Sequence, residues 1–201
     1  MAGIDTKGTS AGTVDLYWLP LGAGGHSVRL NGKAFEAVVS RAERRPSRDL
    51  YHSALVVGTA DGHVVVEQAP AWGDDGSGRG VVAEGAVGSR RAGRLRPFRY
   101  EVRRWPGGVI SDIAEAVDSP RRLTSDREVA RRLLDLVATV PTPVWGRDEL
   151  RTGEMWNSNS TISWLIVSSG IPANTIEPPA GGRAPGWRAG VVVAERMRDG
   201  R

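Results

Sequence analysis

LYHSALVVGTADGHVVVEQAP, residues 50–70, contains two apolar, β-branched runs on either side of an Asp-Gly pair. Two such runs joined by a short turn predict a β-hairpin. A four-residue loop at 59–62 pairs Gly58 with His63 at its base. This pairing sets the register of the whole hairpin, because the side chains of a strand alternate between its two faces.

A histidine and a glutamate fall on one face of this hairpin. In the predicted register His52 lies opposite Ala69, and Ala54 lies opposite Glu67. Diagonal neighbours on one face are about 7–8 Å apart at the backbone, within reach of long side chains. We therefore expect Glu67 to orient the His52 imidazole, as the third member of a catalytic triad does. A register shift of one residue would move Glu67 to the opposite face.

The segment EMWNSNSTISWLI, residues 154–166, predicts the start of a helix that carries a nucleophile. Ser158 and Ile162 recur at helical spacing, which places Ser158 on the face that packs on the core. The first-turn N–H groups of a helix are unpaired and can hold a developing negative charge. Asn157 or Asn159 could add a side-chain donor. Serine needs a base to become nucleophilic, and His52 is the candidate.

Each of these residues also has a structural interpretation. Serine and asparagine are preferred helix N-caps, so the Asn-Ser-Asn sequence at 157–159 could simply cap the helix. His52 could be an interior histidine whose hydrogen bonds are satisfied. The uncertainty of a helix start leaves Ser160 as an alternative nucleophile. Three aromatic residues near the two segments are candidates for a substrate pocket: Tyr51, Trp72 and Trp156.

The runs HSALVVG, DG and VVVEQAP resemble the opening hairpin of the circularly permuted NlpC/P60 superfamily, especially its lecithin retinol acyltransferase-like and PPPDE-type branches. The resemblance implies a papain-like fold, in which an antiparallel sheet packs against the nucleophile-bearing helix. It also implies a catalytic histidine on the first strand, matched by His52, and a polar third residue on the next strand. The nucleophile of that family follows in an Asn-Cys motif, matched here by Asn157 and Ser158. Serine thus replaces cysteine, and Glu67 stands where one branch has a second histidine.

The rest of the chain predicts a single α+β domain spanning residues 1–201, with helices and an antiparallel sheet segregated. Further strands are expected at 13–21, 81–87, 97–105 and 187–194, and helices at 32–44, 124–137 and 157–169. Residues 73–97 contain the sequence GDDGSGRG and are expected to form a flexible loop around the short strand. Seven tryptophans are many for this length, and most are expected to be core or loop anchors.

The composition excludes several classes of site. Cysteine is absent, which rules out disulfides, thiolate zinc sites and a cysteine nucleophile. The three histidines are too scattered for a standard zinc spacing, and no cofactor or metal is expected. No apolar run approaches the roughly 18 residues that span a bilayer, and no signal peptide is visible, so a cytoplasmic location is expected.

The net charge of +4 and the isoelectric point near 10.1 raise the question of nucleic-acid binding. The densest basic run lies at 90–96, and no aromatic residues are interspersed in it, so a solvated loop is the favoured interpretation. The sequence predicts a hydrolase or acyltransferase acting on an amide, ester or thioester of a small-molecule, peptide or acyl substrate. The alternatives are an inactive papain-like module that binds a peptide or acyl ligand, and an arginine-rich nucleic-acid-binding protein. The substrate, the choice between hydrolysis and transfer, and the oligomeric state stay open.

Overall fold

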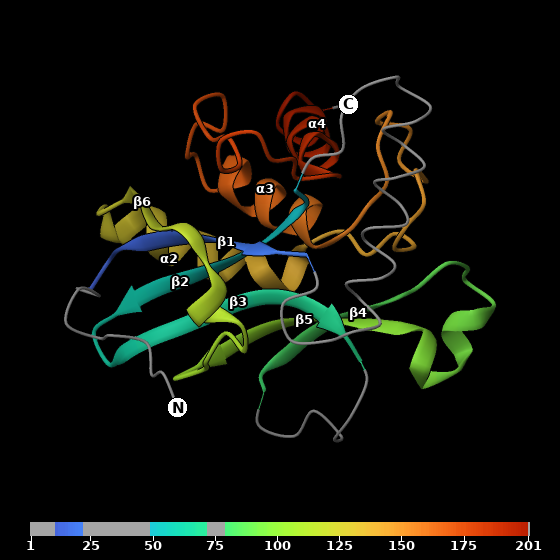
Figure 1. The fold of residues 1–201 in the computed structure, drawn as a ribbon, viewed down its shortest axis with the longest axis horizontal. Coiled ribbons are helices and arrows are strands. Elements are labelled where there is room, and N and C mark those ends of the chain that lie inside the picture. The colour runs from blue at the N-terminus through green and yellow to red at the C-terminus, as the bar shows by residue number, and fades with distance from the viewer. Residues whose placement is uncertain (1–10, 22–48, 72–78, 201) are drawn as a thin grey trace.

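The computed structural model describes residues 11–21, 49–71 and 79–200. Six strands form one sheet in the order β4-β5-β3-β2-β1-β6, and every neighbouring pair is antiparallel (Figure 1). The strands are β1 (Val14–Pro20), β2 (Tyr51–Thr59), β3 (Gly62–Pro70), β4 (Val81–Ala86), β5 (Arg99–Pro106) and β6 (Val117–Thr124).

The helices follow the sheet in the chain. Within the described ranges they are α2 (Arg127–Leu136), α3 (Ser158–Ser168) and α4 (Trp187–Arg198), and these ranges also contain the short 3-10 turns η2 (Ala92–Arg94), η3 (Arg96–Phe98), η4 (Ile113–Glu115) and η5 (Val137–Thr139). Figure 1 shows α3 and α4 together on one side of the sheet. The described residues therefore form an α+β architecture, with strands and helices segregated as the sequence predicts.

The two faces of the sheet bury different clusters. The larger cluster lies between the sheet and the helices and includes Tyr51, Leu55 and Val57 of β2. The smaller cluster lies on the opposite face and includes Ala54 and Val56 of the same strand. The alternation along β2 follows from the two-residue period of a strand and explains why its sequence is apolar almost throughout.

The helix α3 packs closely on α4 because Gly190 lies at their contact. A Cβ atom on Gly190 would collide with the carbonyl oxygen of Ser160 and with the Ser163 hydroxyl. The Ser163 hydroxyl donates to the carbonyl of Trp187 at 2.7 Å, so hydrogen bonds as well as apolar contacts join the two helices. This packing fixes the position of the α3 N-terminus relative to the rest of the fold.

The structure corrects one predicted element and adds a strand that the sequence did not predict. Residues 187–194, predicted as a strand, belong to the helix α4, whose Ala189, Gly190, Val193 and Ala194 are buried at helical spacing. The strand β6 was not predicted, because its sequence VDSPRRLT is polar and contains a proline. Edge strands tolerate proline, since one side of such a strand needs no hydrogen-bonded partner. The predicted helix at 32–44 lies outside the described residues, and residues 79–97 contain β4, η2 and part of η3.

Candidate functional site

The strands β2 and β3 separate part-way along their length. Their ladder joins Leu55–Thr59 to Gly62–Val66, with Gly58 opposite His63 as the sequence predicts. It does not extend to the predicted pairs His52–Ala69 and Ala54–Glu67. There, β2 stays paired with β1 and β3 stays paired with β5. The sheet thus contains a fork between β2 and β3, and the two strands diverge in Figure 1.

A cavity of about 230 Å³ occupies this fork. It is lined by all three predicted catalytic residues: His52 from β2, Glu67 from β3 and Ser158 from the start of α3. The other polar lining residues are Gln68, Arg103, Ser111 and Asp112, and the apolar ones are Leu21, Ala54, Ala69, Pro70, Ile110 and Trp145. Segments about a hundred residues apart in the sequence therefore meet at one hollow.

The capping of α3 distinguishes Ser158 from Ser160. Asn157 is the N-cap, and its Oδ1 accepts hydrogen bonds from the N–H groups of Asn159 and Ser160 at 2.9 and 3.3 Å. The Ser160 hydroxyl completes a capping box by accepting from the Asn157 N–H at 3.1 Å, and it donates to the carbonyl of Gly186 at 2.7 Å. The Ser158 side chain has no such role: it is buried and lines the cavity.

Asn159 ties the first turn of α3 to the strand that carries His52. Its Nδ2 donates to the carbonyl of Tyr51 at 2.9 Å, and its Oδ1 accepts from the Ser53 hydroxyl at 2.8 Å. Tyr51 and Ser53 are the neighbours of His52 on either side. The Asn159 side chain therefore holds the helix start against β2 at the position of the histidine.

The two asparagines predicted as oxyanion donors use their side-chain N–H groups elsewhere. Nδ2 of Asn159 also donates to the carbonyl of Pro185, at 2.9 Å, and Nδ2 of Asn157 donates to the same carbonyl at 2.8 Å. Neither residue lines the cavity. Both act in the framework of the site, one as a cap and the other as the link to β2.

A better-placed donor is Gln68, which sequence reasoning missed. Its Oε1 accepts a hydrogen bond from the Thr161 hydroxyl of α3, while its Nε2 is buried without a hydrogen-bond partner among the described residues. The residue lines the cavity and is 5% exposed. The backbone N–H of Ser158 likewise makes no hydrogen bond within the described ranges. The sequence did contain a signal for Gln68, because it is a polar residue at an inward-facing position of an apolar strand.

His52 is only partly exposed, and burial lowers its pKa from 6.5 to about 4. The imidazole is therefore neutral at pH 7, the form in which one ring nitrogen can accept a proton. Within the described part of the chain, it makes no hydrogen bond to Ser158 or Glu67. The cavity brings the three predicted residues together without joining them by hydrogen bonds.

Glu67 binds a buried arginine. Its Oε1 accepts from Nη1 of Arg103 at 2.8 Å, and Nη2 of the same guanidinium donates to Glu101 at 2.8 Å. The Arg103 and Glu101 side chains are 7% and 5% exposed, and Glu67 is 18% exposed. One guanidinium is thus shared by two carboxylates at the wall of the cavity.

The aromatic residues proposed for a substrate pocket are placed differently. Tyr51 and Trp156 belong to the main core and do not line the cavity. Trp72 lies outside the described residues. Among the described lining residues is a different tryptophan, Trp145, whose ring contacts Tyr100 edge-on with centroids 5.7 Å apart.

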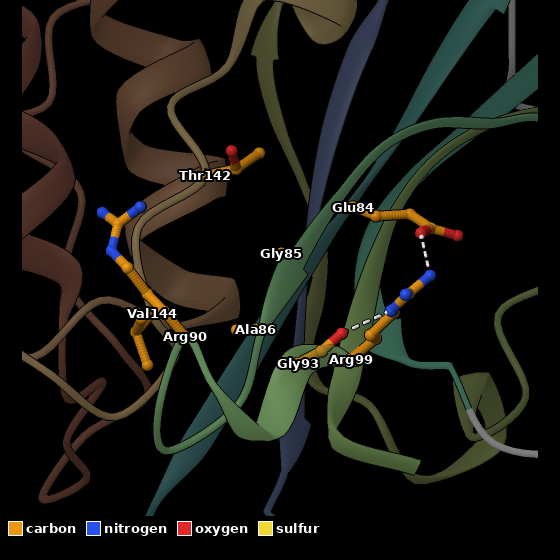
Figure 2. Close-up of a pocket in the computed structure, with 8 residues that line it drawn as sticks. All are labelled: Glu84, Gly85, Ala86, Arg90, Gly93, Arg99, Thr142 and Val144. Atoms are coloured by element: carbon orange, nitrogen blue, oxygen red, sulfur yellow. Dashed lines mark hydrogen bonds and ion pairs between the residues drawn. The ribbon is translucent and has the colours of Figure 1, made fainter. Parts of the chain in front are cut away.

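A second cavity of about 360 Å³ lies between β4 and residues 142–144 (Figure 2). Its charged residues are paired: Arg99 binds Glu84 at 3.3 Å, and Arg90 binds Glu149 at 2.9 Å. Arg99 also donates to the carbonyl of Gly93 at 2.6 Å, as Figure 2 shows. A hydroxyl is present on Thr142, but the described lining of this cavity contains no histidine. The smaller cavity is therefore the better candidate for acyl chemistry.

Comparisons with protein-family models, with curated proteins and with solved structures gave no match. The candidate site thus rests on its own geometry. Among the described residues, no three His, Asp or Glu side chains are grouped so that they could hold a metal ion. In the same residues, every helix is too short or too polar to cross a bilayer.

Proposed function

We propose that the protein is a hydrolase or acyltransferase of papain-like fold in which Ser158 attacks an amide, ester or thioester carbonyl. The observation that carries this proposal is the shared cavity of His52, Glu67 and Ser158 at the fork of the sheet. A nucleophile at a helix N-terminus and a neutral imidazole in one cavity are the groups that acyl transfer needs.

The proton would move between Ser158 and His52. The neutral imidazole takes the proton from the hydroxyl as the Oγ–acyl bond forms, and it returns that proton to the leaving group as the old bond breaks. Water or a second acceptor then attacks the acyl-serine, with His52 again as the base. His52 is uncharged at neutral pH, as the start of each step requires, and its pKa of about 4 makes it a weaker base than a free imidazole.

The developing oxyanion would be held by two donors, one at the start of α3 and one on β3. The Ser158 N–H carries the positive end of the helix dipole, and the buried Gln68 Nε2 has no other hydrogen-bond partner among the described residues. Glu67 would favour the imidazolium that forms during the reaction through its charge, while Arg103 holds its carboxylate in place.

Labelling with a fluorophosphonate probe, followed by intact-mass measurement, tests the proposal. We expect one adduct on the wild type and none on Ser158→Ala. Labelling of His52→Gln should be at least about a hundredfold slower, the usual scale of general-base catalysis. Ser111→Ala is the matched control, because Ser111 is another serine of the same cavity and its variant should label normally. An adduct that persists on Ser158→Ala would contradict the assignment of the nucleophile.

A non-catalytic module that binds a peptide or acyl ligand is the second candidate. It is favoured by the lack of a hydrogen bond from His52 to either Ser158 or Glu67 within the described ranges, and by the engagement of Glu67 with Arg103. In that case the folded wild type would give no fluorophosphonate adduct. The cavity would then act by binding alone.

A further inference from the structure

The described lining of the cavity at the fork is acidic, although the chain as a whole carries a net charge of +4. Glu67 and Asp112 contribute carboxylates to its wall, and Arg103 contributes the one guanidinium among the described lining residues. That guanidinium is shared with Glu101, which lies beside the wall. With His52 neutral, the described residues of the wall, together with Glu101, carry an excess of negative charge.

Asp112 is the carboxylate of the cavity that has no partner among the described residues. It precedes the turn η4, and its side chain makes no capping hydrogen bond there. No ion pair of Asp112 occurs within the described part of the chain, whereas Glu67 is held by Arg103. Burial, and then the charge of Glu115, raise the pKa of Asp112, so its ionised form would gain from a nearby cation.

Two further features of the wall indicate what kind of group would enter. Trp145 lines the cavity, and an indole ring is a group on which an organic cation can pack. Gln68, almost fully buried, has a side-chain N–H group with no partner among the described residues, and it can donate to an acceptor such as a carbonyl. The volume of about 230 Å³ lies below the roughly 300–1,000 Å³ of pockets for drug-sized ligands, so it suits a single small chain.

We propose that this cavity binds a small primary ammonium group on an alkyl chain, and that Asp112 is the residue that selects it. This inference rests on the proposed function, because it takes the ammonium group to be part of the acyl substrate. The binding itself does not require turnover, because Asp112 and Trp145 act on the free cation as they would on the substrate. Acidic acyl groups would be repelled by the same wall.

Isothermal titration with n-pentylammonium, pentan-1-ol and pentanoate tests this selectivity. The three ligands share a chain and differ in charge. On the wild type we expect pentylammonium to bind at least about tenfold tighter than pentanol, and pentanoate to bind weakest. In Asp112→Asn the advantage of the cation over the alcohol should disappear. Glu115→Gln is the matched control, because it removes a nearby charge from the same turn without altering the cavity wall, and it should keep the preference.

Equal binding of the three ligands by the wild type would overturn the inference. So would equal loss of the preference in Asp112→Asn and Glu115→Gln, since general electrostatics would then explain it. Thermal unfolding of each variant shows that the fold is kept. If Ser158 is labelled by the fluorophosphonate but no cation preference exists, this inference fails alone. If the cation preference exists and Ser158 is not labelled, the proposed catalysis fails and the cation site stands.

Discussion

At the scale of single residues, His52 is predicted to make stability depend on pH. Its pKa is lowered to about 4 in the folded chain, from 6.5 for a free histidine. Between these values the unfolded chain binds a proton that the folded chain does not, so acid favours unfolding. The free energy of unfolding should fall as the pH drops from about 6.5 to about 4, by at most about 3 kcal/mol. Urea unfolding of the wild type and of His52→Gln at about pH 7.5, 5.5 and 4.5 measures this, and the glutamine variant should lack this part of the fall.

Asn159 is predicted to position the site rather than take part in the chemistry. Asn159→Leu would remove the hydrogen bonds to Tyr51, Ser53 and Pro185, and should destabilise the fold by about 2–3 kcal/mol. Ser53→Ala removes one of these bonds and should cost about 1 kcal/mol. In the folded fraction of Asn159→Leu, fluorophosphonate labelling of Ser158 should also be slower. An unchanged labelling rate at reduced stability would show that Asn159 is only structural.

At the scale of elements, the contact of α3 with α4 is predicted to control the site from a distance. Gly190→Ala places a methyl group against the Ser160 carbonyl and the Ser163 hydroxyl, and such overpacking costs about 1–3 kcal/mol. The helices can relieve the clash by moving apart, which would shift the first turn of α3 and slow labelling of Ser158. Arg188→Ala, an exposed change on the same helix, is the control and should alter neither property. If Gly190→Ala were as stable as the wild type in urea unfolding, that result would contradict this close packing.

Local sequence signals predicted some elements and missed others for physical reasons. The β2–β3 hairpin followed from its Asp-Gly turn, which sets the register near the loop, here Gly58 opposite His63. The turn could not reveal where the ladder ends, because the fork depends on the pairing of β3 with β5. The run WRAGVVVA resembles a strand by its valines, yet packing against α3 makes it part of α4. Tertiary contacts thus outweighed intrinsic preference.

At the scale of the whole molecule, the same limit applies to the site. The sequence named His52, Glu67 and Ser158, and these three residues line one cavity. It could not find Asp112 or Gln68, because only the folded sheet brings the segment after β5 and the end of β3 to the start of α3. The sequence also could not show that Asn159 links α3 to β2. An oxyanion donor and a helix cap are both expected at a helix start, so the position of the asparagine does not separate them. Residue types suggested the chemistry, and the fold decided which polar groups remain available.

The charge of the whole molecule yields the last prediction, that the protein binds DNA only weakly. Three of the described surface arginines are paired with carboxylates: Arg90 binds Glu149, Arg99 binds Glu84, and Arg131 binds both Glu128 and Asp135. Non-specific DNA-binding proteins have dissociation constants of about 10⁻⁴ to 10⁻⁶ M at physiological salt, through phosphate contacts made by unpaired cations.

We expect a dissociation constant weaker than about 10⁻⁴ M for a labelled duplex in fluorescence anisotropy at about 150 mM salt. Glu149→Gln frees Arg90 within the basic run at 90–96, so this variant should bind more tightly than the wild type at low salt. Micromolar binding by the wild type at physiological salt would instead favour the nucleic-acid interpretation. In that case the pairing of surface arginines with carboxylates would not keep this basic chain from binding DNA.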